Sequence, residues 1–311
     1  VWSAKGAKKH IITSAVEHHA VLDTCKWLGQ NGCDVTILPT DKFGMIDPDS
    51  LANAIREDTL LVSVMHANNE VGTVNPIAKL GEICRNRGVI FHTDAVQSVG
   101  HMPVNLKELP VDMLTMSAHK MYGPKGVGAL YIRKGLKLVP IIHGGGQEFG
   151  IYSGTENVPG IIGFGAAARL AVKLHEGGEE KRIALLRDKL INGVLGRIPD
   201  TVLTGHRAER LPFHASFCIR GADGSDILLE IDKAGIGGSS GSACTSGSTA
   251  PSYVLLAMGL DHGTAHGSVR LTLNKNTTEE DINYVLEKFP PIVKSLRSAS
   301  RYGSDKMKRR S

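Results

Sequence analysis

Residues 113–126 read MLTMSAHKMYGPKG, and the predicted fold is arranged around this stretch. Residues 113–116 form an apolar run typical of a buried strand, and the glycines and proline after Lys120 indicate a turn. An ammonium group held among apolar strands is costly unless its pKa falls, and an amine in a pocket forms Schiff bases with carbonyl cofactors. The plainer alternative is that Lys120 extends from the strand end into solvent.

Other predicted strands also end in polar residues. Residues 89–94 read VIFHTD, and Asp94 at their end could keep a pyridine nitrogen protonated, which is what pyridoxal phosphate needs to accept electrons. Asn69 follows the strand predicted at residues 60–65, and His18 follows the strand predicted at residues 10–14. Strand ends that carry such side chains in succession indicate ligand binding at the carboxyl edge of an open parallel sheet.

The spacing of apolar residues between 10 and 175 predicts strands alternating with helices. Helices are expected at residues 19–30 and 77–87, and Gly88 should end the second. Such alternation is typical of a parallel sheet covered by helices on both faces.

A long helical region is predicted over residues 160–198, with a break at Gly177 and Gly178. This region should carry the chain out of a large domain, residues 1–176, into a smaller C-terminal α/β domain, residues 177–311. The smaller domain contains a Gly/Ser-rich stretch, residues 237–248, which we expect to form a mobile loop around Cys244.

The last helix of the chain has predicted start and stop signals. Thr277 and Glu280 have the spacing of a capping box, in which a hydroxyl and a carboxylate satisfy the first backbone N–H groups. Pro290 and Pro291 should kink or end the helix that follows.

Composition narrows the function classes. The chain has 311 residues, of which 41% are hydrophobic, enough for a substantial core. The net charge of +5 arises mainly in residues 300–311, which hold five basic residues and one acidic residue, so we predict no nucleic-acid binding. The most apolar long stretch, residues 158–174, is interrupted by Arg169 and Lys173, so no membrane association is expected.

Cysteine usage indicates a reducing compartment. The five cysteines are odd in number and show no CxxC spacing, which argues against a disulfide framework and a structural zinc site. We therefore expect a cytoplasmic protein with no bound metal.

Eight motifs occur along the chain in a recognisable order. They are TSAVEHHAVLDTC, NNEVGTVNPI, FHTDAVQSVG, SAHKMYGPKG, HGGGQEFG, SGTENVPG, SSGSACTSG and SVRLTLNKNTTEED. Together they resemble the cysteine desulfurases of the NifS/IscS type, which belong to the class V aminotransferases. The resemblance extends over nearly the whole chain.

This resemblance implies a fold and a reaction. The fold would be the aspartate-aminotransferase-like α/β fold (fold type I), with a mostly parallel seven-strand-type sheet in the large domain and a smaller C-terminal α/β domain. The reaction would use pyridoxal phosphate to take sulfur from L-cysteine, giving L-alanine and a persulfide on Cys244.

The resemblance also implies roles for individual residues. The catalytic residues would be Lys120, Cys244 and His18. The cofactor would be held by Lys120, His18, Asn69, Asp94, Gln97, Ser117, His119 and Thr155, and the substrate by Arg270 and Asn69. Plainer readings stay open: His18 as a surface histidine, Asn69 and Gln97 as strand-end caps, Ser117 and His119 as partners of backbone groups, Thr155 as a helix cap, and Arg270 in a surface salt bridge.

The partners implied are a second copy of the chain and a sulfur acceptor. In the family the threonine corresponding to Thr155 serves the neighbouring subunit, so we expect a homodimer. The acceptor would be an iron–sulfur scaffold protein or another sulfur carrier, and Cys244 could be a transient iron–sulfur ligand shared with it.

The chain departs from its relatives in a few places. Relatives carry a phosphate-binding segment before the point at which this sequence begins, so we expect either that the sequence is a fragment or that the phosphate is held by what remains. Relatives also commonly have arginine where this chain has Tyr152 and Lys275. Two alternatives therefore remain at this point: a selenocysteine lyase or another pyridoxal-dependent lyase or aminotransferase of the same fold, and a cofactor-free sulfur-relay or binding protein derived from such an enzyme.

Overall fold

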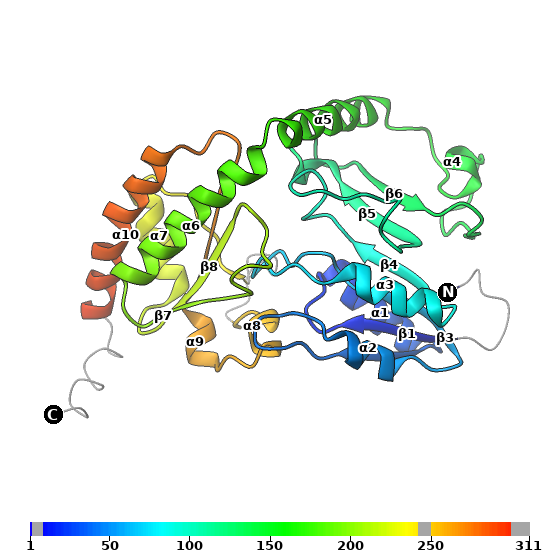
Figure 1. The fold of residues 1–311 in the computed structure, drawn as a ribbon, viewed down its shortest axis with the longest axis horizontal. Coiled ribbons are helices and arrows are strands. Elements are labelled where there is room, and N and C mark those ends of the chain that lie inside the picture. The colour runs from blue at the N-terminus through cyan, green and yellow to red at the C-terminus, as the bar shows by residue number, and fades with distance from the viewer. Residues whose placement is uncertain (2–8, 242–249, 300–311) are drawn as a thin grey trace. The chain divides into compact units, whose positions relative to one another are not determined.

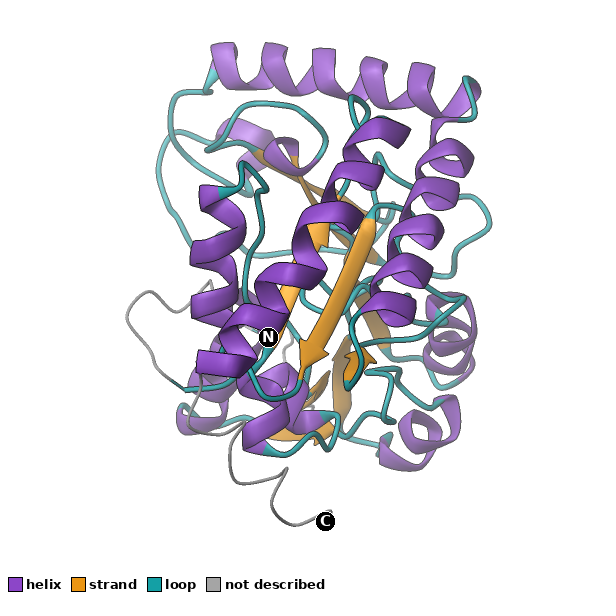
Figure 2. Ribbon diagram, turned by 90° about the vertical axis from the view of Figure 1, so that its left-hand side faces the viewer, coloured by secondary structure: helices purple, strands orange, loops and turns teal. Residues whose placement is uncertain are grey.

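A computed structural model of the chain describes residues 1, 9–241 and 250–299 and divides into two units (Figure 1). The first unit comprises Val1–Pro39, Ile46–Ala67 and Asn75–Gly177. The second comprises Thr40–Met45, Asn68–Val74 and Gly178–Ser311. Two short pieces of the N-terminal half therefore belong to the second unit, and both units combine helices with strands (Figure 2).

The first unit is built on a mostly parallel sheet. Its strands are β1 (His10–Ser14), β2 (Asp34–Leu38), β3 (Thr59–Ser63), β4 (Ile90–Asp94), β5 (Met113–Ser117) and β6 (Gly128–Ile132). The strand order is β2-β1-β3-β4-β5-β6, and only β6 pairs antiparallel with its neighbour. The predicted α/β class and parallel sheet are confirmed, with six strands among the described residues instead of the seven expected.

Helices cover both faces of this sheet. The helices of the unit are α1 (His19–Gln30), α2 (Pro48–Ala54), α3 (Ile77–Asn86) and α5 (Val158–Glu176), with the short 3₁₀ helix η1 (Ala118–Lys120) after β5. The short α4 (Gln147–Gly150) buries none of its residues. Neighbouring residues of a strand point to opposite faces. Ile11 accordingly packs with Cys25 and Leu28 of α1, whereas Ile12 packs with Leu80 and Cys84 of α3.

The predicted helix limits agree closely with the structure. Helix α1 spans the predicted residues, and α3 ends one residue early, before Gly88 with its positive φ of 63°. The predicted break at Gly177 and Gly178 is also confirmed, because α5 ends at Glu176 and α6 begins at Glu179.

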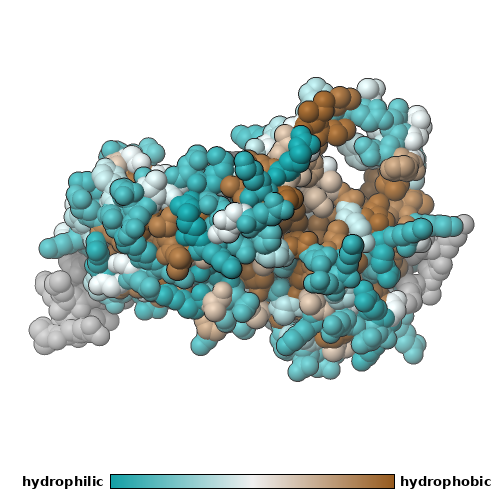
Figure 3. Space-filling view, turned by 45° about the horizontal axis from the view of Figure 1, so that its top comes forward, coloured by the Kyte–Doolittle hydropathy of each residue, from teal (hydrophilic) through white to brown (hydrophobic). Residues whose placement is uncertain are grey.

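Helix α5 buries small residues and exposes large apolar ones. Gly160, Ala167 and Ala171 face inward, and a Cβ atom at Gly163 would lie 2.8 Å from Cγ of Pro124. The large apolar side chains of the helix remain exposed, namely Val158, Ile161, Ile162 and Val172. Figure 3 shows apolar side chains, in brown, at the molecular surface. A helix with this distribution has an apolar face that its own unit does not cover.

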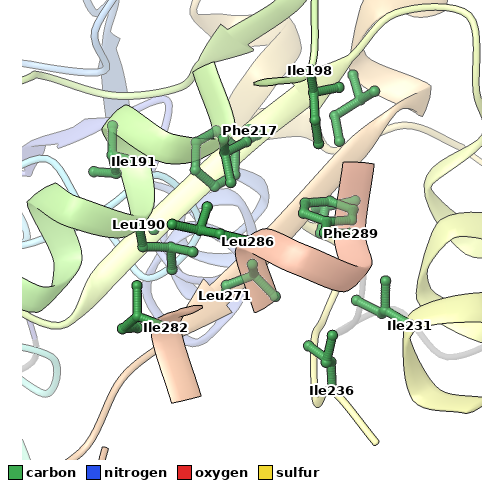
Figure 4. Close-up of a cluster of buried hydrophobic side chains, with 14 of the residues drawn as sticks. Leu190, Ile191, Ile198, Phe217, Ile231, Ile236, Leu271, Ile282, Leu286 and Phe289 are labelled. Atoms are coloured by element: carbon green, nitrogen blue, oxygen red, sulfur yellow. The ribbon is translucent and has the colours of Figure 1, made fainter. Parts of the chain in front are cut away.

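The second unit has a three-stranded antiparallel sheet in the order β7-β8-β9. Its strands are β7 (Thr201–Leu203), β8 (His214–Ile219) and β9 (Ser268–Thr272), and its helices are α6 (Glu179–Arg197), α7 (Gly224–Lys233), α8 (Tyr253–Ala257), α9 (His262–His266) and α10 (Glu279–Ala299). Figure 4 shows its apolar core, where Phe217 of β8 lies among side chains of α6 and α10, including Leu190 and Phe289.

The start of α10 corrects one sequence prediction. The capping box forms one residue later than expected: the N–H of Asp281 donates to Oγ1 of Thr278 at 3.2 Å, and the N–H of Thr278 donates to Oδ2 of Asp281 at 2.9 Å. Asp281, rather than Glu280, therefore closes the box with Thr278.

Helix α10 continues through Pro290 and Pro291 to Ala299 instead of ending there. A proline at 290 has no N–H to donate to the carbonyl oxygen of Leu286. Nη1 of Arg197 donates to that oxygen instead, at 2.7 Å, so the acceptor left by the proline is satisfied from α6.

Candidate functional site

Several of the predicted cofactor residues follow strands that end at the carboxyl edge of the first unit's sheet. Strands β1, β3, β4 and β5 are parallel, so their C-terminal ends lie at one edge. His18 follows β1, Asp94 ends β4, and Lys120 follows β5 through η1. The half-buried Gln97 lies just beyond Asp94. The sequence prediction of a site at this edge agrees with this placement.

The carboxylate of Asp94 is partly buried, and its Oδ1 accepts a hydrogen bond from the N–H of Val96 at 3.0 Å. Burial raises its pKa, while that hydrogen bond and the nearby His18 oppose the rise. A carboxylate whose charged form is disfavoured by burial gains from a cationic partner. A protonated pyridine nitrogen would be such a partner.

His18 is the N-cap of α1, where its Nδ1 accepts a hydrogen bond from the N–H of Ala20 at 3.2 Å. Because Nδ1 accepts, the neutral ring carries its proton on Nε2. Nδ1 of the neighbouring His19 instead lies 3.0 Å from Oδ2 of Asp23. His18 is therefore held by the helix start, unlike an ordinary surface histidine.

The turn at Ala118–Lys120 leaves Lys120 more exposed than a lysine held among buried strands would be. Ala118 is buried, but Lys120 is exposed, so the expectation of an ammonium held among apolar strands is wrong for this chain. The strand ends at Ser117, and the tight turn directs only Ala118 inward. Oγ of Ser117 lies 2.7 Å from Nδ1 of His119. Burial and the charges of Lys120 and Lys125 lower the pKa of His119.

Thr155 and Tyr152 are both exposed in the segment before α5. The N-cap of α5 is Asn157, whose Oδ1 accepts from the N–H of Gly160 at 3.1 Å. Thr155 is therefore not the cap of that helix, and its hydroxyl lies on the surface of the chain.

The predicted substrate residues belong to the second unit. Nη1 of Arg270 donates to the backbone oxygen of Asn69 at 2.6 Å, and Nη2 donates to Oγ of Ser239 at 3.1 Å. Nε2 of the buried His214 lies 3.2 Å from the same Asn69 oxygen. Arg270 is therefore held in place by defined hydrogen-bond partners. Nζ of Lys275 donates a hydrogen bond to Oδ1 of Asn276 at 3.1 Å.

Several buried or half-buried polar residues of the first unit were not predicted from the sequence. Oγ of Ser63 and Oγ1 of Thr115 lie 2.8 and 2.7 Å from the two ring nitrogens of His92, so a polar row crosses β3, β4 and β5. Burial lowers the pKa of His92 to about 4. The only available signal was a histidine two positions before Asp94, on the same face of β4.

Glu17 is fully buried, and its Oε1 accepts from Oγ of Ser14 at 2.6 Å and from the N–H of Met65 at 2.8 Å. Burial raises its pKa to about 8, and the charge of Asp94 adds to this effect. The carboxyl group is therefore mostly protonated at neutral pH, directly before His18 in the chain.

The predicted nucleophile Cys244 lies outside the described residues. Cys25, Cys84 and Cys218 are buried thiols, and Cys33 is half-buried. Burial raises the pKa of Cys84 and of Cys218 to about 12, which makes both poor nucleophiles near neutral pH.

The amine, carboxylate, imidazole and hydroxyl groups at this edge form a donor set that fits pyridoxal phosphate. Within residues 9–241 and 250–299, no three histidine, cysteine, aspartate or glutamate side chains converge in a way that would hold a metal ion. No helix in the described part of the chain has both the length and the apolar character needed to cross a bilayer.

The known proteins that are similar to this chain belong to a family whose cofactor fits that donor set. Residues 2–285 match the family described as aminotransferase class-V. The chain is 53% identical over 300 residues to the cysteine desulfurase IscS of Dictyoglomus turgidum, covering 96% of this chain and 75% of that protein. It is 50% identical over 307 residues to the cysteine desulfurase IscS of Methanosarcina thermophila, with coverage of 96% and 75%. The solved structure of a NifS-like protein aligns with a TM-score of 0.85 and 39% identity, over 93% of this chain and 76% of that one.

Proposed function

Because the chain belongs to the class-V aminotransferase family, and within it to the cysteine desulfurases, we propose that it converts L-cysteine to L-alanine and takes the sulfur onto a thiol of its own. The Cβ–Sγ bond of the substrate breaks, and its sulfur forms an S–S bond with the sulfur of the enzyme thiol. The enzyme thiol loses its hydrogen, and the new methyl group of alanine gains one. The carbon is reduced by two electrons and the sulfur pair is oxidised by two. No external oxidant or reductant is required.

The cofactor of this family is pyridoxal phosphate. When bound, it supplies a ring that accepts the electron pair released as the substrate's Cα–H bond breaks. Asp94 would face the pyridine nitrogen, and Lys120 would attach the cofactor through its amine. By resemblance to the family we assign the remaining contacts to His18 at the ring, Asn69 and Gln97 at the phenolic oxygen, and Ser117, His119 and Thr155 at the phosphate.

Two side chains of the first unit would handle protons. Lys120 lies on an exposed turn, and we assign to its Nζ the removal of the substrate's Cα proton. His18, whose neutral ring carries its proton on Nε2, would donate and recover a proton during turnover.

Arg270 would bind the carboxylate of L-cysteine. A planar guanidinium suits a carboxylate because it can offer two parallel N–H donors. The hydrogen bonds from Arg270 to Asn69 and Ser239 fix the position of this charge before substrate arrives, which supports the assignment.

Cys244 would be the thiol that receives the sulfur. The raised pKa values of Cys84 and Cys218 support this choice, because their thiolates are scarce at neutral pH. The persulfide would then pass to an iron–sulfur scaffold protein or another sulfur acceptor. Cys25, Cys33, Cys84 and Cys218 are all free thiols, which is consistent with a reducing compartment, so we place the enzyme in the cytoplasm.

The exposed apolar face of α5 supports a homodimer. Val158, Ile161 and Ile162 lie at the i, i+3 and i+4 spacing of one helix face, and each is at least 46% exposed. A second copy of the chain would cover this face, and Thr155, which precedes the helix, would then serve the phosphate site of that copy.

The test of this function is product analysis of the Lys120→Ala variant. The parent protein, loaded with pyridoxal phosphate, should form alanine and sulfane sulfur in equal amounts from L-cysteine, and Lys120→Ala should form neither. Lys79→Ala, which removes an exposed lysine of α3, is the matched control and should retain the parent rate. Formation of alanine by Lys120→Ala at the parent rate would refute the assignment.

A second measurement identifies the thiol. After brief exposure to L-cysteine, mass spectrometry should find added sulfur on Cys244 of the parent protein. Cys244→Ser should still bind the cofactor and carry no added sulfur. Sulfur found on Cys33 or Cys25 in the parent, with Cys244 unmodified, would exclude the proposed role.

A further inference from the structure

The carboxylate of Glu70 is buried in the second unit beside residues on both sides of the segment that contains Cys244. Glu70 is 6% exposed, and the hydroxyl of Ser252 donates a hydrogen bond to its Oε2. The same hydroxyl oxygen accepts from the N–H of Leu255 at 3.3 Å and so caps α8. Ser252 therefore uses its single hydroxyl proton on Glu70 and a lone pair on the helix.

Gly241 approaches the same carboxylate from the other side of the segment. A Cβ atom there would lie 2.7 Å from Oε2 of Glu70 and 3.0 Å from Cβ of Ser252. The N–H of Gly241 donates to Oγ of Ser268 in β9 at 3.3 Å. Residues 241 and 252 thus meet at one carboxylate, and residue 241 is also tied to the sheet.

The packing around this carboxylate is close. A cavity of about 10 Å³ is lined by Glu70, Gly241, Ser268 and Arg270 among others, and its size is close to that of a single water molecule. A side chain at residue 241 would therefore displace Glu70 or Ser252. The glycine permits this approach, which no other residue could make without a shift.

The backbone turn at Glu70 does not depend on its carboxylate. Oδ1 of Asn68 accepts from the N–H groups of Glu70 and Val71, at 2.8 and 2.9 Å, and two backbone hydrogen bonds, from Gly72 to Asn68 and from Asn68 to Thr73, close the same turn. The hydrogen bond and the close contact made by the Glu70 side chain are instead to Ser252 and Gly241. The carboxylate therefore acts on the residues that flank the cysteine segment.

We propose that Glu70 is a positioning residue for sulfur transfer, which acts by fixing Gly241 and Ser252 relative to each other. This inference rests on the proposed function, since it concerns the delivery of Cys244 to its substrate. A displacement of about 1 Å at a reacting group can cost roughly a hundredfold in rate, so the fixed spacing of these two residues bears directly on turnover.

The Glu70 side chain acts chiefly as a hydrogen-bond acceptor for the hydroxyl of Ser252. Burial raises its pKa to about 7, against the opposing effects of the Ser252 hydrogen bond and the positive charge of Arg270. A group with this pKa is partly neutral at neutral pH. A neutral glutamine, which keeps an oxygen at the same reach, should therefore replace it.

The experiment compares Glu70→Ala and Glu70→Gln in a single turnover with L-cysteine, using protein loaded with pyridoxal phosphate. Two rates are measured: the absorbance change of the cofactor on mixing, and the appearance of added sulfur on Cys244 by mass spectrometry. We expect Glu70→Ala to slow sulfur addition at least about tenfold while the absorbance change keeps the parent rate. Glu70→Gln should stay within about twofold of the parent in both.

The matched control is Glu280→Ala, which removes an exposed carboxylate of the second unit and should leave both rates unchanged. Sulfur addition at the parent rate in Glu70→Ala would overturn the proposal. Equal slowing of both rates would also overturn it, because that result indicates a general structural effect. A parent protein that adds no sulfur at any cysteine would instead refute the proposed function.

A second pair of variants applies if Glu70→Ala does not fold. Ser252→Thr keeps the hydroxyl that donates to Glu70, and Ser252→Ala removes it. Sulfur addition should be slowed at least about tenfold in the alanine variant and close to the parent rate in the threonine variant. Equal rates in the two variants would contradict the proposal.

Discussion

Nε2 of His101 lies 2.5 Å from the backbone carbonyl oxygen of Lys120. A carbonyl oxygen can only accept, so Nε2 carries the proton. Burial is the main cause that lowers the pKa of His101, and the nearby ammonium of Lys120 acts in the same direction. A neutral imidazole that donates to this carbonyl holds the peptide of the residue to which the cofactor would attach.

We predict that His101→Leu lowers kcat about three- to tenfold, because a hydrogen bond of this kind contributes about 0.5–1.5 kcal/mol. His101→Gln should recover most of the rate, since its amide nitrogen can occupy the position of Nε2. Steady-state kinetics and a pH titration of the bound cofactor's absorbance provide the measurements. An unchanged rate and titration in His101→Leu would contradict the prediction.

The second prediction concerns the charge of Asp94. Asp94→Asn keeps an oxygen for the N–H of Val96 but removes the negative charge. Charged hydrogen bonds contribute about 1.5–3 kcal/mol, so the affinity for pyridoxal phosphate should fall about ten- to a hundredfold. Equilibrium dialysis of the cofactor measures this directly. The control Asp49→Asn, an exposed carboxylate of α2, should bind like the parent.

The third prediction concerns the pH dependence of stability. The pKa of Glu17 is about 8 in the folded chain, against an ordinary value of 4.5. At a pH between these two values, the folded chain therefore holds a proton that the unfolded chain has released. The free energy of unfolding therefore falls by about 1.4 kcal/mol per pH unit as the pH rises through this range. Glu17→Gln has no proton to lose and should lack this contribution.

Urea unfolding of both proteins at pH 5, 6, 7 and 8 tests this prediction. Other titrating groups, including Glu70, contribute equally to both proteins, so the difference between the two curves isolates Glu17. Parallel curves would show that Glu17 is ionised in the folded chain.

The fourth prediction concerns the exposed face of α5. Val158→Lys combined with Ile162→Lys places two charges on that face and should convert a dimer to a monomer. Leu185→Lys is the control, because Leu185 is 73% exposed but lies on α6. Sedimentation equilibrium measures the outcome. A dimer that persists in the double variant would exclude this face as the interface.

Local sequence signals predicted local structure well. Helix α1 has the predicted limits because His18, the apolar spacing of Leu22, Cys25 and Leu28, and the following glycine all favour the same helix. The capping box of α10 was misplaced by one residue, since Thr277 and Thr278 are each followed three positions later by an acidic residue. Sequence spacing alone does not distinguish the two.

Long-range contacts were not predictable in the same way. Glu70 was visible only as part of the NNEVG motif, and its partner Ser252 lies 182 positions away. The sequence left both a buried and an exposed Lys120 open, because an apolar run before a residue does not show which way a turn will direct it. The motifs identified the chemistry of the site but not the groups that hold it in place.

The inclusion of Asn68–Val74 in the second unit has a consequence for biosynthesis. Protein synthesis proceeds from the N-terminus, so this segment leaves the ribosome well before Arg210 and His214 have been made. Nη1 of Arg210 donates to the carbonyl oxygen of Val71 at 2.8 Å, and Nε2 of His214 reaches that of Asn69. These oxygens stay hydrated until most of the chain has been translated, and a fragment that begins at Gly178 would lack one of the acceptors of its buried arginine, the carbonyl oxygen of Val71.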